Sequence, residues 1–214
     1  MAMDSIEHKD AFAITTVKGL EDLYDDPLEP VLKKQTNYIV EPGRVFIAAS
    51  PFLILATSSA NGVDCSPKGD APGFVQILDD ETLLIPDRPG NNRIDGMRNI
   101  IENSKVGIIF MIPGSDVTYR VNGNAEISID PGLLDRFVVN DKRPCAVIVV
   151  KVEEAFPHCP KAFVRSKLWL QGAKGAPTHI PNIGTFAADR DGGDASYARE
   201  FEADYQERMK DRLY

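Results

Sequence analysis

The chain has 214 residues, with 24 basic and 32 acidic side chains, and its formal net charge at pH 7 is −8. This acidic balance argues against nonspecific binding to nucleic acid and to anionic membrane surfaces. The longest apolar run, residues 106–113, is far shorter than the ~18 residues that a membrane span requires. We therefore expect one large domain with appendages that contacts neither nucleic acid nor membrane.

Cysteine and histidine are too sparse to indicate a disulfide framework or a metal site. The three cysteines are Cys65, Cys145 and Cys159, and no pair has the spacing of a metal-binding motif. The three histidines, His8, His158 and His179, lie far apart in the sequence. An odd number of scattered cysteines is typical of a reducing compartment, and the polar N-terminus lacks the apolar core of a secretory signal. We expect a cytoplasmic protein without a bound metal.

Seven short segments have the composition of β-strands. Several of them are rich in β-branched residues, and Gly, Pro or Asp residues flank them. The segments are residues 52–59, 63–67, 74–78, 82–86, 106–112, 118–129 and 146–155. The first two flank Asn61-Gly62, a dipeptide that strongly favours a hairpin turn. Six or seven strands at this spacing predict a closed barrel.

Helices are expected before, between and after these strands. Residues 31–40 and 44–50 are short candidates separated by Pro42-Gly43, and residues 93–102 place apolar side chains at helical spacing. Further candidates are residues 131–138, residues 161–170 and a charged helix near the C-terminus. We therefore divide the chain into a helical lead-in (1–40), a barrel domain (41–170) and a C-terminal loop and helix (171–214).

The C-terminal helix carries an apolar stripe. Its members recur every four residues, at Tyr197, Phe201, Tyr205, Met209 and Leu213. A stripe of this kind packs against another part of a protein. We expect it to pack on the barrel or on a partner subunit.

A turn between a strand and a helix is the strongest candidate for ligand binding. It lies in residues 83–93, where Asn91 and Asn92 precede Arg93 at the start of the expected helix 93–102. An arginine beside unpaired backbone N–H groups at a helix start favours a phosphate. The alternative is a helix cap with a surface arginine.

A second candidate lies on the preceding hairpin, in residues 64–70. Pro67 fixes one backbone angle, and Gly69 lets another chain or a ring approach, so Ser66 and Lys68 lie on a stiff edge. The alternative is an exposed turn.

Further cations occur in later segments. Arg120 lies in an otherwise uncharged strand, where it either faces solvent or reaches a ligand. Lys161, Arg165 and Trp169 are spaced so that one helical face would carry all three. A single Trp is more often a buried core residue, but two cations beside it also suit a ligand.

These groups meet the demands of flavin mononucleotide (FMN). Its phosphate needs cations and donors, its dimethylbenzene edge needs apolar packing, and its pyrimidine edge needs hydrogen-bonding groups. The sequence has no phosphate loop, no dinucleotide-binding glycine motif and no nucleophile elbow. We identify no dedicated catalytic residue.

The segment from Phe46 to Trp169 resembles the pyridoxamine 5′-phosphate oxidase-like family of FMN-binding split barrels. The motifs that carry the resemblance are residues 50–57, 64–70, 83–93, 120–123 and 159–169, in the order of the family. The resemblance implies a mainly β protein with flanking helices, built on a six-stranded antiparallel split barrel. It also implies a homodimer with FMN at the subunit interface.

The family pattern also implies the site. Ser66, Pro67, Lys68 and Gly69 would border the flavin ring, and Ile85, Pro86 and Asp87 would run along its other side. Asn92 and Arg93 would hold the phosphate. The site would be closed by Arg120, Lys161, Arg165 and Trp169, some of them from the second subunit.

The leading hypothesis is a cytoplasmic, homodimeric, FMN-dependent oxidoreductase that acts on a small-molecule redox substrate. The segment after Trp169 has no clear match to the basic substrate motif of the name-giving oxidase, so oxidation of vitamin B6 is doubtful. One alternative is a non-catalytic protein that stores or senses flavin. Another is a haem-binding split barrel, for which His158 and His179 are the candidate axial ligands.

Overall fold

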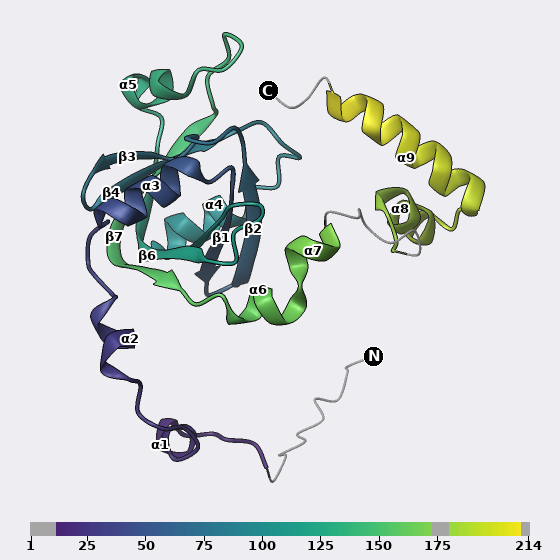
Figure 1. Ribbon diagram of the computed structural model, residues 1–214. Helices are drawn as coiled ribbons and strands as arrows, with labels where there is room; N and C mark the ends of the chain where they lie inside the picture. Colours follow the sequence, from purple (N-terminus) through teal and green to yellow (C-terminus); the bar gives the residue numbers. More distant parts are fainter. Residues whose placement is uncertain (1–11, 173–179, 211–214) are drawn as a thin grey trace. The chain divides into compact units, whose positions relative to one another are not determined.

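The structure is a computed structural model that describes residues 12–172 and 180–210 (Figure 1). The chain divides into two compact units, residues 1–34 and residues 35–214. The described part of the first unit holds two short helices, α1 (Val17–Glu21) and α2 (Glu29–Lys33), neither of which buries a residue. The helix predicted over residues 31–40 is confirmed only for residues 31–33, which lie in α2; the remainder is wrong, because the backbone of Thr36 instead pairs with Ala155.

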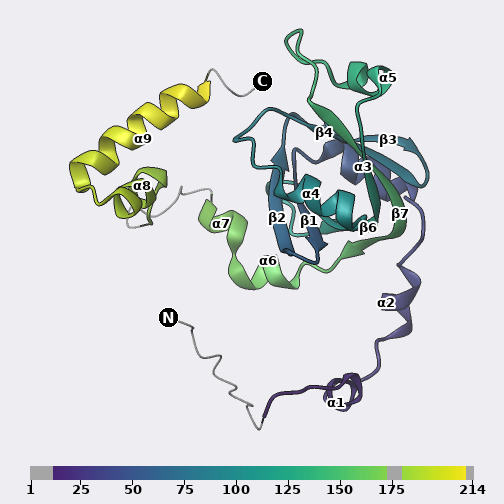
Figure 2. The ribbon, with the colours of Figure 1, turned by 180° about the vertical axis from the view of Figure 1, so that it is seen from behind.

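The second unit is built on one antiparallel sheet. Its strands are β1 (Phe52–Ser59), β2 (Gly62–Gly69), β3 (Gln76–Asp79), β4 (Thr82–Asp87), β5 (Lys105–Met111), β6 (Thr118–Ser128) and β7 (Ala146–His158). The order across the sheet is β2-β1-β5-β6-β7-β4-β3, and the sheet curls on itself (Figures 1 and 2). The fold is a mainly β split barrel with flanking helices. It has seven strands rather than six, because the four-residue β3 pairs with the outer side of β4.

The main core lies inside the curled sheet. Along β1 the buried side chains alternate, with Leu53 and Leu55 pointing inward, as expected for a strand with one covered face. Strand β4 is buried along most of its length. Its Ile85 joins the main core, whereas Leu84 packs with Val147 and Phe137 in a second, smaller cluster.

Helices connect and flank the strands. They are α3 (Glu41–Ala49), α4 (Asp95–Glu102), α5 (Pro131–Leu134), the 3₁₀ turn η1 (Asp135–Phe137), α6 (Lys161–Ser166), α7 (Leu168–Gly172), α8 (Ile183–Asp191) and α9 (Ala195–Lys210). Pro42 lies in the first turn of α3, whereas the sequence predicted it before the helix. Proline is tolerated there because the N–H groups of the first turn have no hydrogen-bond partner within the helix. None of the described helices has the length and apolar character needed to cross a membrane.

Helices α8 and α9 form a hairpin. Gly184 lies so close to Ala198 that any side chain at Gly184 would overlap it, and the backbone N–H of Gly184 donates to Glu202 at 3.0 Å. Four members of the predicted stripe lie on α9, where the ring of Tyr197 stacks on Phe201. The fifth, Leu213, lies outside the described residues. Packing of this stripe on the barrel or on a partner stays a prediction.

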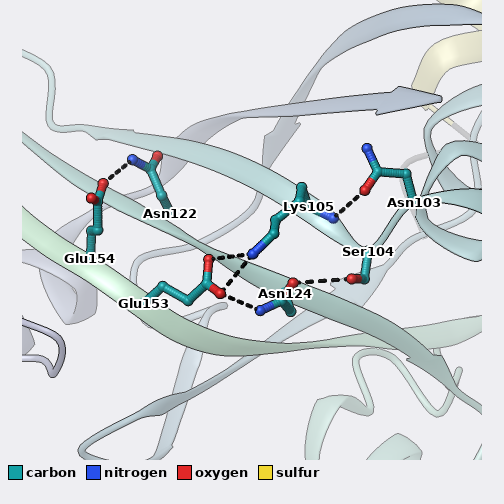
Figure 3. A network of polar contacts seen from close by, with 7 residues as sticks. All are labelled: Asn103, Ser104, Lys105, Asn122, Asn124, Glu153 and Glu154. Carbon is teal, nitrogen blue, oxygen red and sulfur yellow. Dashed lines mark hydrogen bonds and ion pairs between the residues drawn. The ribbon is translucent and has the colours of Figure 1, made fainter. Parts of the chain in front are cut away.

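A β-bulge in β7 places two adjacent glutamates on the outer face of the sheet. The register between β6 and β7 shifts at Asn122 and Gly123, so that Glu153 and Glu154 both point away from the core. Glu154 accepts from Asn122 at 2.8 Å, and Glu153 accepts from Lys105 and Asn124 at 2.7 Å each (Figure 3). The hydrogen bonds from Lys105 and then Asn124 lower the pKa of Glu153.

Two ion pairs join the ends of β2 and β4, and we call this junction the seam. Lys68 Nζ lies 2.7 Å from Asp87 Oδ1, and Arg88 Nε lies 2.8 Å from Asp70 Oδ2. No backbone ladder joins β2 to β4 or β3 within the described part of the chain. Since β2 lies at one edge of the sheet and β4 is next to the other, charged side chains connect the barrel at this point.

The Asp70–Arg88 pair makes the seam testable. The side chains of Asp70 and Arg88 are 5% and 16% exposed. Removal of a carboxylate from a buried ion pair leaves a poorly solvated charge, so Asp70→Ala should lower the free energy of unfolding by about 3 kcal/mol. Urea unfolding measures this effect. The control is Asp135→Ala, which removes an exposed partner of Arg143 and should cost less than about 1 kcal/mol; equal losses in the two variants would contradict the prediction.

Candidate functional site

The two faces of β2 differ in burial. Asp64, Ser66 and Lys68 are half-buried, whereas the side chains that alternate with them are exposed. Lys68 and Ser66 pair in register with Leu53 and Leu55, so they lie on the inner face of the sheet. Pro67, a predicted site residue, lies on the outer face.

Gly69 ends β2 where another segment approaches closely. A Cβ at Gly69 would lie 3.3 Å from the carbonyl oxygen of Pro51, which also accepts the N–H of Asp70. The absence of a side chain thus lets the chain after β2 pass close to β1. This close approach agrees with the conformational reason for expecting a glycine there.

The end of β4 provides one polar group beside Lys68. Ile85 and Pro86 are buried, and Ile85 packs in the main core. Asp87, the next residue, is half-buried and holds the Lys68 ammonium group. The predicted residues of β2 and β4 are therefore brought together through Lys68 and Asp87.

The turn before α4 has an unusual backbone. Asn92 has a φ of +59°, a left-handed conformation that asparagine tolerates better than most residues. The side chain of Asn91 accepts the N–H of Arg93 at 2.9 Å. No side chain caps the N-terminus of α4. The turn therefore projects Arg93 just ahead of the first helical amides.

Arg93 is exposed and interacts with carboxylates. Its side chain is 79% exposed, and its Nε and Nη2 donate to Asp95 Oδ2 at 2.9 and 2.8 Å. The hydrogen bonds to Asp95 raise the pKa of Arg93, and the charge of Asp64 acts in the same direction. Arg93 is therefore firmly cationic beside β2.

A cavity of about 430 Å³ lies between the β1–β2 hairpin and α4. Arg93, Arg98 and Asp64 are among the residues that line it. Helix α4 approaches β2 closely because Gly96 has no side chain; a Cβ there would lie 2.9 Å from Asp64 Oδ2. The helix is also held by Asn99, whose amide donates to Thr57 at 3.1 Å.

The two predicted basic groups do not line the same cavity: Arg93 lines it, and Lys68 does not. Arg93 and Asp64 line the same cavity, and Lys68 follows Asp64 by four residues on the same side of the strand. At about 3.3 Å per residue, these two positions of β2 are roughly 13 Å apart. One elongated ligand could therefore extend from Arg93 to Lys68 along the strand.

Arg120 lies on the opposite face of the sheet from Lys68. Its strand position pairs with Ile109 on β5, which pairs with Ile54 on β1 and so belongs to the outer face. The guanidinium carbon is 5.1 Å from the centre of the Phe156 ring, and the buried Nε has no hydrogen-bond partner. Within one chain, Arg120 and Lys68 are not brought together.

The predicted single helix over residues 161–170 is wrong. Lys167 adopts a left-handed conformation with a φ of +52°, which ends α6 before α7 begins. Lys161 and Arg165 lie on α6, but Trp169 lies on α7, so one helical face does not carry all three. Trp169 stacks on Phe163 with ring centres 5.7 Å apart and donates to the carbonyl of Ser115 at 2.7 Å.

Sequence reasoning missed several charged members of this region. They are Asp64, Arg88, Asp95 and Arg98. The spacing of Asp95 and Arg98, three residues apart on a predicted helix, could have indicated that they lie side by side. No local sequence pattern predicts the Arg88–Asp70 pair, because Asp70 follows β2 and Arg88 follows β4.

The histidines do not form a common site among the described residues. His158 is exposed at the end of β7, and His179 lies outside the described residues. Within residues 12–172 and 180–210, no cluster of three or more histidine, cysteine, aspartate or glutamate residues could hold a metal ion. Haem ligation by these histidines stays a prediction.

Comparison with known proteins identifies one family over the barrel. A family model described as pyridoxamine 5′-phosphate oxidase matches residues 41–159, more than half of the chain. No curated protein matches.

Several solved structures are similar to the chain. HupZ of Group A Streptococcus is 23% identical with a TM-score of 0.46, over 56% of this chain and 93% of that one. A putative pyridoxamine 5′-phosphate oxidase of Lactobacillus delbrueckii is 26% identical with a TM-score of 0.45, over 56% and 95%. An FMN-binding protein of Syntrophomonas wolfei is 18% identical with a TM-score of 0.45, over 56% and 86%.

Proposed function

Because the chain belongs to the pyridoxamine 5′-phosphate oxidase family, we propose that it binds FMN and acts as an FMN-dependent oxidoreductase. The proposed site lies along the inner face of β2, between the end of β4 and the start of α4. The observation that carries the proposal is that Arg93 and Asp64 line one cavity, and that Lys68 follows Asp64 on the same face of β2. Two cations separated along one strand would suit a ligand that has a phosphate at one end and a polar ring at the other.

The residues at the α4 end suit a phosphate. Arg93 provides a guanidinium group, whose parallel N–H donors match phosphate oxygens. The left-handed Asn92 turns the chain so that the uncapped amides of α4 begin directly after this arginine. The cavity at this end is open enough, at about 430 Å³, to admit the group.

The residues at the seam suit the ring of a flavin. Lys68 supplies one cation, Ser66 supplies a hydroxyl group on the same face, and Asp87 limits the motion of the lysine. The side chains of Lys68 and Asp87 are 23% and 20% exposed, so a ligand can still reach them. Their pairing would orient the Lys68 ammonium group toward a carbonyl edge of the ring.

Bound FMN would supply hydride acceptance and donation at its ring. The chain would contribute binding, orientation and electrostatics, and no side chain is assigned as a nucleophile or general base. A cation close to the pyrimidine edge stabilises negative charge on that edge. Lys68 would therefore favour the reduced form of the cofactor, with Asp87 moderating the effect.

The assembly and the substrate belong to the same proposal. Arg120 lies on the opposite face of the sheet from Lys68, so in this proposal it reaches the ligand of a second copy of the chain. Lys161, Arg165 and Trp169 would contribute from the segment that follows β7. We propose a cytoplasmic homodimer that acts on a small-molecule redox substrate.

Absorbance spectroscopy tests the proposal. The purified chain, incubated with FMN and freed of excess ligand, should retain a yellow flavin spectrum. Anaerobic addition of NADH, NADPH or another donor should bleach this spectrum, and an added acceptor should restore it. A chain that retains no FMN would refute the proposal, whereas retention without turnover by any donor would favour the non-catalytic flavin-binding alternative.

A further inference from the structure

A second guanidinium group lies at the same cavity as Arg93. Arg98 projects from α4 with 69% of its side chain exposed, and both arginines line the cavity. Between them lies Asp95. Its Oδ2 accepts two hydrogen bonds from Arg93, and its Oδ1 lies 3.8 Å from Arg98 Nη1. One carboxylate is thus shared by two guanidinium groups.

Local geometry explains this arrangement. Asp95 and Arg98 are three residues apart on α4, so they lie on neighbouring positions of one helical face. Arg93 reaches the same carboxylate from the turn before the helix. A phosphate monoester carries three terminal oxygens and more negative charge than a carboxylate, and arginine binds both groups through the same donors.

We propose that Arg93 and Arg98 together bind the phosphate monoester of the ligand, and that Asp95 is an internal counter-anion that the phosphate replaces. This inference rests on the proposed FMN site and specifies its phosphate end. It adds Arg98 as a binding residue. It also makes Asp95 a residue that sets affinity by competition.

The other charges at the cavity decide the sign of the Asp95 effect. Asp64 faces the cavity from β2, and Glu102 faces it from the last turn of α4, where Asn61 donates to it at 3.1 and 3.4 Å. Two arginines and three carboxylates give the cavity lining a formal charge of −1. A phosphate dianion must therefore displace the Asp95 carboxylate from the two arginines, against a lining that is already negative. Removal of the Asp95 charge should strengthen phosphate binding.

Isothermal titration of the full-length chain with inorganic phosphate, FMN and riboflavin tests this inference. Arg98→Ala should weaken binding of inorganic phosphate and of FMN by about tenfold. Asp95→Asn should strengthen both by about threefold to fivefold, the range of an exposed charge pair. Riboflavin, which has no phosphate, should bind equally to all variants. Arg98→Lys keeps the charge and should recover part of the lost affinity.

A matched control separates the site from general charge effects. Arg143→Ala removes another exposed arginine that pairs with an aspartate, Asp135, but does not line the cavity. It should leave all three affinities unchanged. Because Arg98 is exposed, its substitution should also leave the unfolding midpoint of the chain nearly unchanged, which circular dichroism checks.

The possible failures are distinguishable. The inference is overturned if wild-type chain does not bind inorganic phosphate, if Arg98→Ala has no effect on it, or if Asp95→Asn weakens it. The inference stands, and the proposed function fails, if phosphate binding responds as expected while neither FMN nor riboflavin binds. Equal effects of Arg98→Ala on FMN and riboflavin would also overturn the inference, because they would place Arg98 away from the phosphate.

Discussion

Arg93→Glu is expected to weaken FMN binding at least 100-fold, because it replaces the proposed phosphate-binding group with a carboxylate. A hydrogen bond between charged groups contributes roughly 1.5–3 kcal/mol, and the new negative charge would add repulsion from the phosphate. Asp64 and Asp95 already lie beside this position, so the substituted glutamate would add another carboxylate to the same cavity. Quenching of flavin fluorescence on titration measures the affinity.

Two controls make the Arg93 result specific. Riboflavin should bind to Arg93→Glu and to wild-type chain with similar affinity, because the proposed contact of Arg93 is with the phosphate and not with the ring. Arg143→Glu introduces the same charge reversal away from the cavity and should leave FMN binding unchanged. Retention of full FMN affinity by Arg93→Glu would reject the assignment of the phosphate.

Gly123→Ala is expected to destabilise the fold by about 3 kcal/mol, because a Cβ at this position would overlap a neighbouring backbone. Gly123 lies on β6 at the bulge, and its Cβ would meet the carbonyl oxygen of Lys151 on β7. A backbone atom cannot move aside by changing rotamer. The strands must separate instead, with loss of ladder hydrogen bonds. Urea unfolding, followed by circular dichroism, measures the loss of stability.

Gly107 provides the matched control on the neighbouring strand. A Cβ there would lie 3.4 Å from the side-chain oxygen of Asn122 and 4.0 Å from the Cβ of Ala56, which are ordinary contacts. Gly107→Ala should therefore cost less than about 1 kcal/mol. Equal stability of the Gly123→Ala variant and wild type would show that the bulge can open without cost.

The barrel could be predicted from the sequence because strands leave a local signal. Each of the seven predicted segments overlaps an observed strand, and the Asn61-Gly62 hairpin joins β1 to β2 as expected. Strands alternate apolar and polar residues, and hairpins contain turn-forming dipeptides. Both patterns can be recognised within a few residues of sequence. The family resemblance then supplied the split-barrel topology, which alternation alone does not determine.

The helices were predicted less well, because tertiary contacts override weak local preferences. Residues 34–40 leave the helical conformation where Thr36 pairs with β7 and Ile39 enters the core. No sequence feature at Lys167 predicts its left-handed backbone conformation. Helix α8 was not predicted, since its glycine and alanine residues resemble a loop until their packing against α9 is known.

The candidate site shows the same division. The individual motifs around Lys68 and Arg93 could be predicted from the sequence, because glycine, proline and asparagine beside each cation favour particular backbone conformations. The ion-pair partners of these cations could not be predicted, since Asp87 and Asp95 could equally have faced solvent. The roles of the predicted residues toward FMN stay predictions until binding is measured.

The charged seam between β2 and β4 should make the exchange of a bound ligand depend on salt concentration. Backbone ladders are nearly indifferent to ionic strength, whereas partly exposed charge pairs weaken as counterions accumulate around them. The Lys68–Asp87 pair is the more exposed of the two contacts and therefore loosens first, while Asp70 and Arg88 keep the strand ends in register. We therefore expect a rise in salt concentration to open the barrel at the seam, first at Lys68 and Asp87.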